Sequence, residues 1–444
     1  MLLFWGIVLS TQPPAVTSYL NALGLGEGYY HQALHWFQSS AFSVDSLCIA
    51  WGEWLSHHRY VERLQGELLY VGDGIKVAKE GRRMPGVKGL HQESSDVSKP
   101  EWIRGHYFSA LGLLLGAGTA LFAVPIAFKL HDGIEASDAE LQALTLVDKM
   151  ARLCISDMSA GSYVVLDAYY ASAKVLQPFR AHRLHLISRV RISTVARATF
   201  SPLPGKRGRG RPRKWGSEIS LKLLFEPLDV CQKAVVWLYG QETTVYYQCF
   251  KLFWDSPNAP VLFVLTQLPN GKRMILLSSD VTLSGNQVIE AYGKRFKIEV
   301  CFRTFVLLLG GFAYQFWLKL LDKTTQFPPN LCLTDYPAPA QHQIQQKVEA
   351  FERFVNLNAI VLGVLQILAL ELPQSVWVNF PRWFRTLPEH GYPTEQIVHL
   401  TLQHQQSMVL PRSRPTLLLS QLIADKVECS TTLDTPKLAD GCNY

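Results

Sequence analysis

Three acidic residues stand where a carboxylate could hold a metal ion. Asp73 interrupts the apolar run 68–77 between two glycines, and Asp167 ends the apolar run S-Y-V-V-L-D. Glu299 follows in a stretch with helical periodicity. A charge within an apolar strand is costly unless a partner offsets it. Carboxylates from two strands and one helix can converge on Mg²⁺, which prefers oxygen ligands.

Two such cations could support phosphoryl transfer, because they activate a water or a 3′-hydroxyl and stabilise the leaving oxygen. Taken alone, each residue has a plainer interpretation. A strand-end Asp is commonly a turn or cap residue, and a helical Glu among cations commonly forms a solvated ion pair. The joint occurrence favours the metal site, as does the spacing of Tyr292, Arg295 and Glu299, which places all three on one helix face. An arginine there suits a phosphate, because its planar fork makes two contacts.

The elements that would position these residues alternate between strands and helices, which indicates an α/β fold. We expect strands at 68–77, 111–130 and 162–168, an amphipathic helix at 138–155, and helices at 286–317 and 345–372. Aromatic and β-branched runs between 235 and 279 predict several antiparallel strands. The uncharged stretch 111–128 approaches the length of a membrane span, but its glycines favour two buried strands around a turn.

The chain has 444 residues, enough for two to four domains at roughly 100 to 200 residues each. We divide it by composition and periodicity into five parts. These are a helical N-terminal domain (1–65), the first part of the core (66–180), a basic and mostly β insertion (181–284), the last core helix with Glu299 (285–325) and a helical C-terminal region with a loosely ordered tail (326–444).

The net charge of +7 is modest, but basic residues are concentrated between 168 and 217, where no Asp or Glu occurs. This concentration indicates a polyanionic partner. Eight scattered cysteines lack zinc or disulfide spacing, so we expect reduced thiols in a cytoplasmic protein with no membrane span. We find no nucleotide-binding glycine motif and no serine-hydrolase motif, so those enzyme classes have no support in the sequence.

The motif Y-x-x-R-x-x-x-E at Tyr292, Arg295 and Glu299, together with G-D-G at Asp73 and V-L-D-A at Asp167, resembles a known family. The resemblance is to the Asp-Asp-Glu transposases of bacterial insertion sequences, in the group with a Tyr-Arg-Glu-Lys signature, and it covers about residues 68–320. It implies an RNase H-like catalytic core with a mostly β insertion between the second and third carboxylates. The three carboxylates would bind Mg²⁺, for which Mn²⁺ can substitute.

The resemblance also implies DNA as the partner, both transposon ends and target, held by a homodimer near the bacterial nucleoid. Tyr292 and Arg295 would contact end phosphates, and we include Lys297 and Arg303 of the same helix in the DNA-binding set. The segment 205–216 resembles an AT-hook, a minor-groove motif, and a flexible loop that attracts only phosphates is an equal alternative. Its basic residues are Lys206, Arg207, Arg209, Arg211, Arg213 and Lys214.

One position departs from the family pattern. The lysine expected seven residues after Glu299 is Val306, and Arg303 is the nearest replacement for its phosphate contact. Two alternatives to a transposase therefore stay open. One is an RNase H-like nuclease without strand transfer, and the other is a DNA-binding protein that kept the fold and lost its activity.

Overall fold

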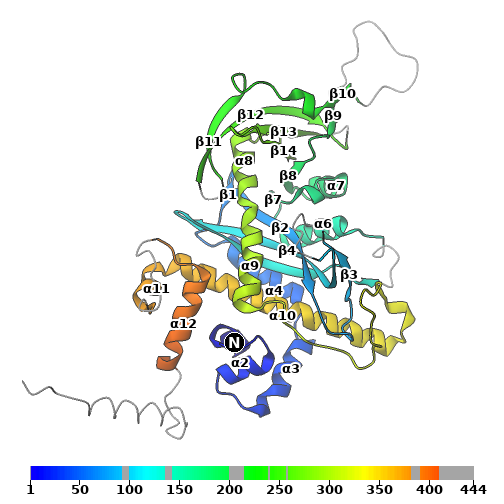
Figure 1. Cartoon of the computed structure of the whole chain (residues 1–444), viewed down its shortest axis with the longest axis vertical. Helices are drawn as coiled ribbons and strands as arrows, with labels where there is room; N and C mark the ends of the chain where they lie inside the picture. The colour runs from blue at the N-terminus through cyan, green and yellow to red at the C-terminus, as the bar shows by residue number, and fades with distance from the viewer. Residues whose placement is uncertain are drawn as a thin grey trace, which may run out of the picture.

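A large mixed sheet with helices on both faces organises the chain (Figure 1). The structure is a computed structural model that describes residues 2–92, 100–135, 143–199, 215–238, 241–256, 259–381 and 391–409. Within these residues thirteen strands belong to the one sheet, and β15 (Leu331–Cys332) pairs separately with β6 (Ile134–Glu135).

Five strands form the part of the sheet that contains the expected carboxylates. They are β2 (Glu67–Ala78), β4 (Trp102–Ala117), β5 (Ala120–Leu130), β7 (Tyr163–Val165) and β8 (His185–Val190). β4 pairs antiparallel with β2 and β5, whereas β7 is parallel to both β2 and β8. The order across the sheet is therefore β5-β4-β2-β7-β8, with the two short strands β1 (Arg63–Leu64) and β3 (Lys88–His91) on β2 and β4. The apolar stretch 111–128 is a hairpin, as predicted, and turns at Gly118, where φ is +57°.

The remaining strands extend the sheet beyond β8 in antiparallel fashion. They are β9 (Val195–Arg197), β10 (Glu218–Ser220), β11 (Gln232–Leu238), β12 (Gln241–Phe253), β13 (Pro260–Gln267) and β14 (Arg273–Ser278). β14 pairs with β8, so the predicted β-rich segment continues the core sheet across this strand. The prediction of several antiparallel strands between 235 and 279 is confirmed.

Three predicted helices have different ends in the structure. The helix expected at 138–155 is α6 (Leu146–Asp157); residues 136–142 lie outside the described part. It begins at Leu146 because Thr145 and Asp148 form a capping box, in which the side chain of each accepts a hydrogen bond from the backbone N–H of the other. The helix expected to reach 317 ends at Leu309, where Gly310 adopts φ +55°. The helix expected at 345–372 is α10 (Ala338–Glu371), because Pro339 is accommodated in its first turn.

The helices α8 (Gly285–Lys294) and α9 (Phe296–Leu309) form one column against the sheet (Figure 1). They meet at Arg295, whose φ of −51° and ψ of −38° are helical. A further helix beside the core strands is α7 (Ala173–Ala181), which lies between β7 and β8 in sequence and contacts β8. The sheet and the helical column together fix where the carboxylates lie.

The chain ends pack against α10. The N-terminal helices are α1 (Leu2–Leu9), α2 (Val16–Ala22), α3 (Tyr30–Gln38) and α4 (Val44–Ser56), and the C-terminal ones are α11 (Pro373–Asn379) and α12 (Glu395–Val409). α1, α3, α4, α11 and α12 all contact α10. Among the described residues α10 is the one helix whose length and composition would allow it to cross a membrane, and most of its apolar stretch is buried within the protein.

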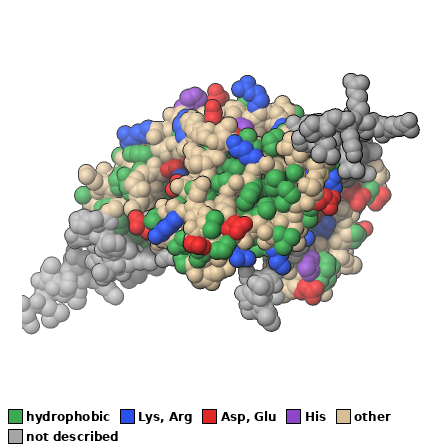
Figure 2. Space-filling view, turned by 90° about the horizontal axis from the view of Figure 1, so that it is seen from above, with side chains coloured by type: hydrophobic (Ala, Val, Ile, Leu, Met, Phe, Trp, Pro, Cys, Tyr) green, Lys and Arg blue, Asp and Glu red, His purple; other side chains and the backbone are tan. Residues whose placement is uncertain are grey.

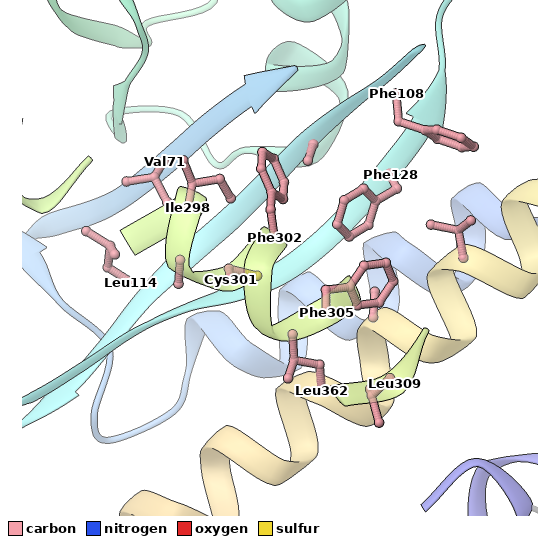
Figure 3. Close-up of a cluster of buried hydrophobic side chains, with 14 of the residues drawn as sticks. Val71, Phe108, Leu114, Phe128, Ile298, Cys301, Phe302, Phe305, Leu309 and Leu362 are labelled. Carbon is pink, nitrogen blue, oxygen red and sulfur yellow. The ribbon is translucent and has the colours of Figure 1, made fainter. Parts of the chain in front are cut away.

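The sheet separates two hydrophobic cores, because successive strand residues point to opposite faces. One core lies between the sheet and α9, where Ile298, Cys301 and Phe305 meet Val71 and Phe128 (Figure 3). The second core lies on the α6 face and is built from side chains such as Leu111, Leu113, Met150, Cys154 and Leu166. Burying both faces explains why the central strands have long apolar runs.

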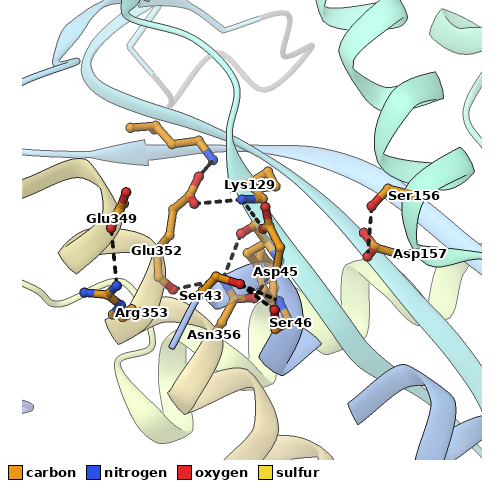
Figure 4. A network of polar contacts seen from close by, with 12 residues as sticks. Ser43, Asp45, Ser46, Lys129, Ser156, Asp157, Glu349, Glu352, Arg353 and Asn356 are labelled. Atoms are coloured by element: carbon orange, nitrogen blue, oxygen red, sulfur yellow. Dashed lines mark hydrogen bonds and ion pairs between the residues drawn. The ribbon is translucent and has the colours of Figure 1, made fainter. Parts of the chain in front are cut away.

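A buried ion pair attaches α10 to the edge strand β5 (Figure 4). Lys129 Nζ lies 3.0 Å from Glu352 Oε2 and also contacts Asp45 of α4, and the Leu130 N–H donates to Glu352 Oε1 at 3.0 Å. Asn356 completes the attachment, because its side chain bonds both the N–H and the C=O of Phe128, at 2.8 and 2.9 Å. The Glu352 side chain is only 10% exposed, so Lys129 is needed to offset its charge.

We therefore expect Lys129→Met to lower the free energy of unfolding by about 2 kcal/mol, because it leaves the Glu352 carboxylate buried without its partner. Urea denaturation at neutral pH measures the loss. Lys174→Met is the matched control, because Lys174 pairs with Asp148 at the surface and should contribute less than about 1 kcal/mol. The double variant Lys129→Met, Glu352→Gln should recover part of the loss. Equal losses in the two single variants would contradict this role for Lys129.

Asp157, at the end of α6, gives a pH-dependent prediction. Burial raises the pKa of Asp157 to about 6, against a hydrogen bond from Ser156 that lowers it. A carboxyl whose folded-state pKa lies above its unfolded value of 3.8 contributes stability below pH 4, and this contribution is lost as pH rises through about 6. Asp157→Asn should accordingly be more stable than the parent at pH 7.5, by on the order of 1 to 2 kcal/mol.

The advantage of Asp157→Asn should shrink as pH falls toward 4.5, which denaturation curves at both pH values would detect. Asp322→Asn, at an exposed position, controls for the loss of one negative charge. An Asp157→Asn advantage that stays the same at both pH values would show that burial of the charge is not its cause.

Candidate active site

Asp73 lies on the face of the sheet that α9 covers. In β2 the side chains of Leu69, Val71 and Val77 enter the core beneath α9, and strand alternation places Asp73 on the same face. Its register partner on β4 is Ala110, whose small side chain also belongs to this core. The Gly74 N–H donates to Asp73 Oδ1 at 2.8 Å. Asp73 is thus a carboxylate within an otherwise apolar row of side chains.

Asp167 reaches the same face from the neighbouring strand. β7 runs parallel to β2, and Tyr163 and Val165 belong to the core beneath α9. Asp167 continues this alternation directly after the strand, two residues beyond Val165. Val71 is opposite Val165 in the register of β2 and β7, and two further residues along each chain bring Asp167 near Asp73, although 94 positions separate them in sequence.

Glu299 is brought over the strands by the packing of α9. Ile298, Cys301, Phe302 and Phe305 form the buried face of this helix, and Glu299 lies one turn beyond Arg295 on a more exposed side. Because the backbone of Arg295 is helical, α8 continues into α9 without a break. Tyr292, Arg295 and Glu299 therefore follow one another along the same helical column.

The Arg295 guanidinium connects the three carboxylates. Its Nη1 lies 3.1 Å from Asp73 Oδ2 and 4.0 Å from Asp167 Oδ1, and its Nη2 lies 2.6 Å from Glu299 Oε1. The Arg295 side chain is 17% exposed, against 40% for Asp167 and 44% for Glu299. The arginine is therefore the inner member of the group, and the outer sides of two carboxylates are open to solvent.

The electrostatics follow from this arrangement. Burial raises the pKa of Asp73 to about 6, and the neighbouring Asp167 and Glu299 charges act in the same direction. The Gly74 N–H and Arg295 oppose the rise. Burial of Arg295 acts to lower its pKa, but the surrounding carboxylates outweigh it and the pKa of Arg295 is raised. Arg295 is thus cationic at physiological pH.

The donor set suits a divalent cation in its chemistry. Asp73, Asp167 and Glu299 supply hard carboxylate oxygens of the kind that Mg²⁺ and Mn²⁺ bind. Their arrangement is not yet that of a metal site: in the part of the chain that the structure describes, no group of three or more Asp, Glu, His or Cys side chains is close enough to hold a metal ion. The Arg295 side chain contacts the carboxylate oxygens that a cation would use.

The other predicted DNA-binding residues do not all join this group. Tyr292 is 8% exposed and packs in the core beneath α9. Lys297 lies on the side of α9 toward α12, where the Glu395 charge acts on its pKa, although burial lowers that pKa overall. Arg303 is exposed one turn beyond Glu299, and Val306 is 45% exposed.

The basic segment falls in the stretch 200–214, outside the described residues, so Lys206, Arg207, Arg209, Arg211, Arg213 and Lys214 stay predictions. At its end Arg197 lies over the Trp215 ring, 5.0 Å from the centroid. On the face shown in Figure 2, Lys and Arg side chains are dispersed around hydrophobic ones and do not form one continuous patch.

A tyrosine pair beside Asp73 was missed by the sequence analysis. The hydroxyls of Tyr107 and Tyr170 are 3.1 Å apart, and the Tyr107 hydroxyl occupies the space where a side chain at position 74 would be. A Cβ at Gly74 would lie 1.9 Å from it. Burial raises the pKa of Tyr107 to about 12, and the Asp73 charge adds to the rise. The glycine after Asp73 was the available signal, because such a position permits a close approach.

Comparisons with known proteins find a family domain within this chain. Residues 94–306 match the family model described as "Transposase DDE domain", a range that includes Asp167, Arg295 and Glu299 and begins after Asp73. No curated protein matches the chain. A similar solved chain comes from the cryo-EM structure of a piggyBac transposase synaptic complex with hairpin DNA, with 12% identity and a TM-score of 0.35. The match covers 84% of this chain and 59% of that transposase, so the present chain spans less than two thirds of its length.

The family model and the geometry concern the same part of the molecule. The matched range contains the second expected carboxylate, the whole β insertion and the helix column that carries Arg295 and Glu299. Two of the three carboxylates that meet at Arg295 thus lie within it. The chain thus carries a transposase DDE domain over residues 94–306.

Proposed function

We propose that this protein is a DNA transposase of the insertion-sequence type, which cleaves DNA at the ends of its element and joins those ends to a target. The observation that carries the proposal is the convergence of Asp73, Asp167 and Glu299 at one guanidinium, 3.1, 4.0 and 2.6 Å away. Two strands and a helix from distant parts of the sequence supply these oxygens. A structural role alone does not require three carboxylates around one arginine.

The strand order supports an RNase H-like core as part of this proposal. Three antiparallel strands, β5, β4 and β2, are followed across the sheet by two parallel ones, β7 and β8. In this arrangement the first carboxylate lies on the central strand and the second follows its parallel neighbour. The antiparallel segment β9–β14 then lies between the second and third carboxylates in sequence.

Asp73, Asp167 and Glu299 would hold Mg²⁺ or Mn²⁺, which supplies activation of the attacking oxygen and stabilisation of the leaving one. In the first step water attacks the phosphodiester at the element end, which gives a 5′-phosphate and a free 3′-hydroxyl. In the second step this hydroxyl attacks a target phosphodiester and expels the target 3′-oxygen. Arg303, which is exposed on α9, and Arg295, which is largely buried at the start of that helix, would orient the DNA phosphates.

The partners in this proposal are element ends and target DNA, and pairing of two ends calls for a homodimer working in the cytoplasm near the nucleoid. The basic segment 205–216 would add phosphate contacts that weaken as salt is raised. The replacement of the family lysine by exposed Val306 favours a second candidate, a DNA-binding protein without activity. The same experiment separates the two.

We expect Glu299→Gln to reduce excision and joining at least about a hundredfold in a cell-based assay that uses the gene's flanking DNA as donor, because it removes a carboxylate charge that the cations require. Asp167→Asn should behave in the same way. Glu290→Gln, at an exposed position on α8 in the same helical column, is the matched control and should retain activity.

Three other results would each change the assignment. Cleaved ends without joined products would indicate a nuclease. Binding of element ends by a parent protein that neither cleaves nor joins would indicate an inactive DNA-binding protein. Full activity of Glu299→Gln would show that this carboxylate does not belong to the catalytic set.

A further inference from the structure

Arg295 contacts the oxygens that the proposed function assigns to divalent cations. Its two Nη atoms are divided between Asp73 on one side and Glu299 on the other, at 3.1 and 2.6 Å, and Asp167 lies 4.0 Å from the first. Bridging of this kind uses the planar fork of a guanidinium, and an ammonium group has no equivalent geometry. Arg295 thus holds two strand carboxylates and one helix carboxylate together with a single positive charge.

A cation would compete with Arg295 for the oxygens of Asp73 and Glu299 that face the guanidinium. Asp73 Oδ2 and Glu299 Oε1 accept charge-assisted hydrogen bonds from Arg295, which are among the stronger bonds in proteins, and Asp167 Oδ1 lies at ion-pair distance from it. Within the described residues no set of acidic side chains is already close enough to hold a metal ion. A cation must replace the guanidinium at these oxygens if all three carboxylates are to contribute.

We propose that Arg295 is an internal counter-ion that competes with divalent cations for Asp73, Asp167 and Glu299, so that cation binding requires its side chain to leave these carboxylates. The inference rests on the proposed function, because it assumes that these residues bind cations. It assigns Arg295 a positioning role: in the cation-free protein it prevents the three negative charges from repelling one another.

The local structure allows this exchange. Arg295 lies at the junction of α8 and α9, and its backbone is already helical, so rotation of the side chain alone can move the guanidinium. The Asp167 and Glu299 side chains are 40% and 44% exposed, which provides an open path toward solvent. A phosphate oxygen of bound DNA is a suitable new acceptor, because the guanidinium fork fits phosphate as well as carboxylate.

The test is a titration of the purified full-length chain with Mn²⁺ in the absence of DNA, with free Mn²⁺ measured by electron paramagnetic resonance. Arg295→Met should bind Mn²⁺ about tenfold more tightly than the parent, because the competing charge is gone. Glu299→Gln should bind more weakly than the parent. Arg152→Met, which removes an exposed arginine on the other face of the sheet, is the control for net charge and should leave the affinity within about twofold.

Thermal unfolding provides a second measurement if repulsion destabilises Arg295→Met. This variant should unfold at a lower temperature than the parent in EDTA, and excess Mn²⁺ should raise its melting temperature by more than it raises that of the parent. Arg295→Lys keeps the charge but loses the fork, so its Mn²⁺ affinity should fall between those of the parent and Arg295→Met.

The outcomes separate this inference from the proposed function. Mn²⁺ binding that is weakened by Glu299→Gln but no tighter in either Arg295 variant would overturn the competition and leave the metal site in place. Mn²⁺ binding that is absent from the parent and all variants, or indifferent to Glu299→Gln, would overturn the metal site and this inference with it.

Discussion

The packing of α9 across the sheet is the interaction on which the candidate site depends. Ile298, Cys301 and Phe305 are buried against Val71, Leu114 and Phe128 of three neighbouring strands (Figure 3). Interiors are close-packed, so this contact fixes both the rotation and the height of the helix. Glu299, on the side of the helix turned away from the core, therefore reaches the same place beside Asp73 and Asp167. The geometry of the candidate site thus follows from an apolar contact that includes none of its residues.

Charge compensation is the second constraint, and the molecule meets it twice in similar ways. Arg295 holds three carboxylates on one face of the sheet, and Lys129 is held by Asp45 and Glu352 near the end of β5. Each is a cation among acids that burial alone would disfavour. The two differ in their surroundings. Glu352 is buried where α10 packs on β5, whereas the Glu299 and Asp167 side chains are partly exposed, so that ligands can approach them. The Lys129 group therefore suits a fixed attachment of α10, whereas the Arg295 group suits an exchange of binding partners.

The helical ends of the chain cover a sheet edge that the core strands would leave open. β5 pairs only with β4 among the described strands and would present an open edge, which invites unwanted pairing. α10 covers this strand, and Asn356 and Glu352 bond its backbone at Phe128 and Leu130. The N-terminal helices and α12 then bury the outer sides of α10. The apolar composition of α10 is in this way explained by burial within the protein.

The sequence by itself determined the types of element and singled out the residues of the candidate site. Alternating and periodic apolar residues predicted the strands and the helices, and Asp73 and Asp167 stood out because a charge in an apolar strand needs a reason. Helix ends were predicted less well, since Thr145 and Gly310 set two of them through capping and a left-handed backbone that periodicity does not reveal. Only tertiary structure decided that Arg295 bridges the carboxylates and that Tyr107 fills the space over Gly74. These contacts join residues from strands and helices far apart in the chain, and their distances depend on how those elements pack, which no local pattern encodes.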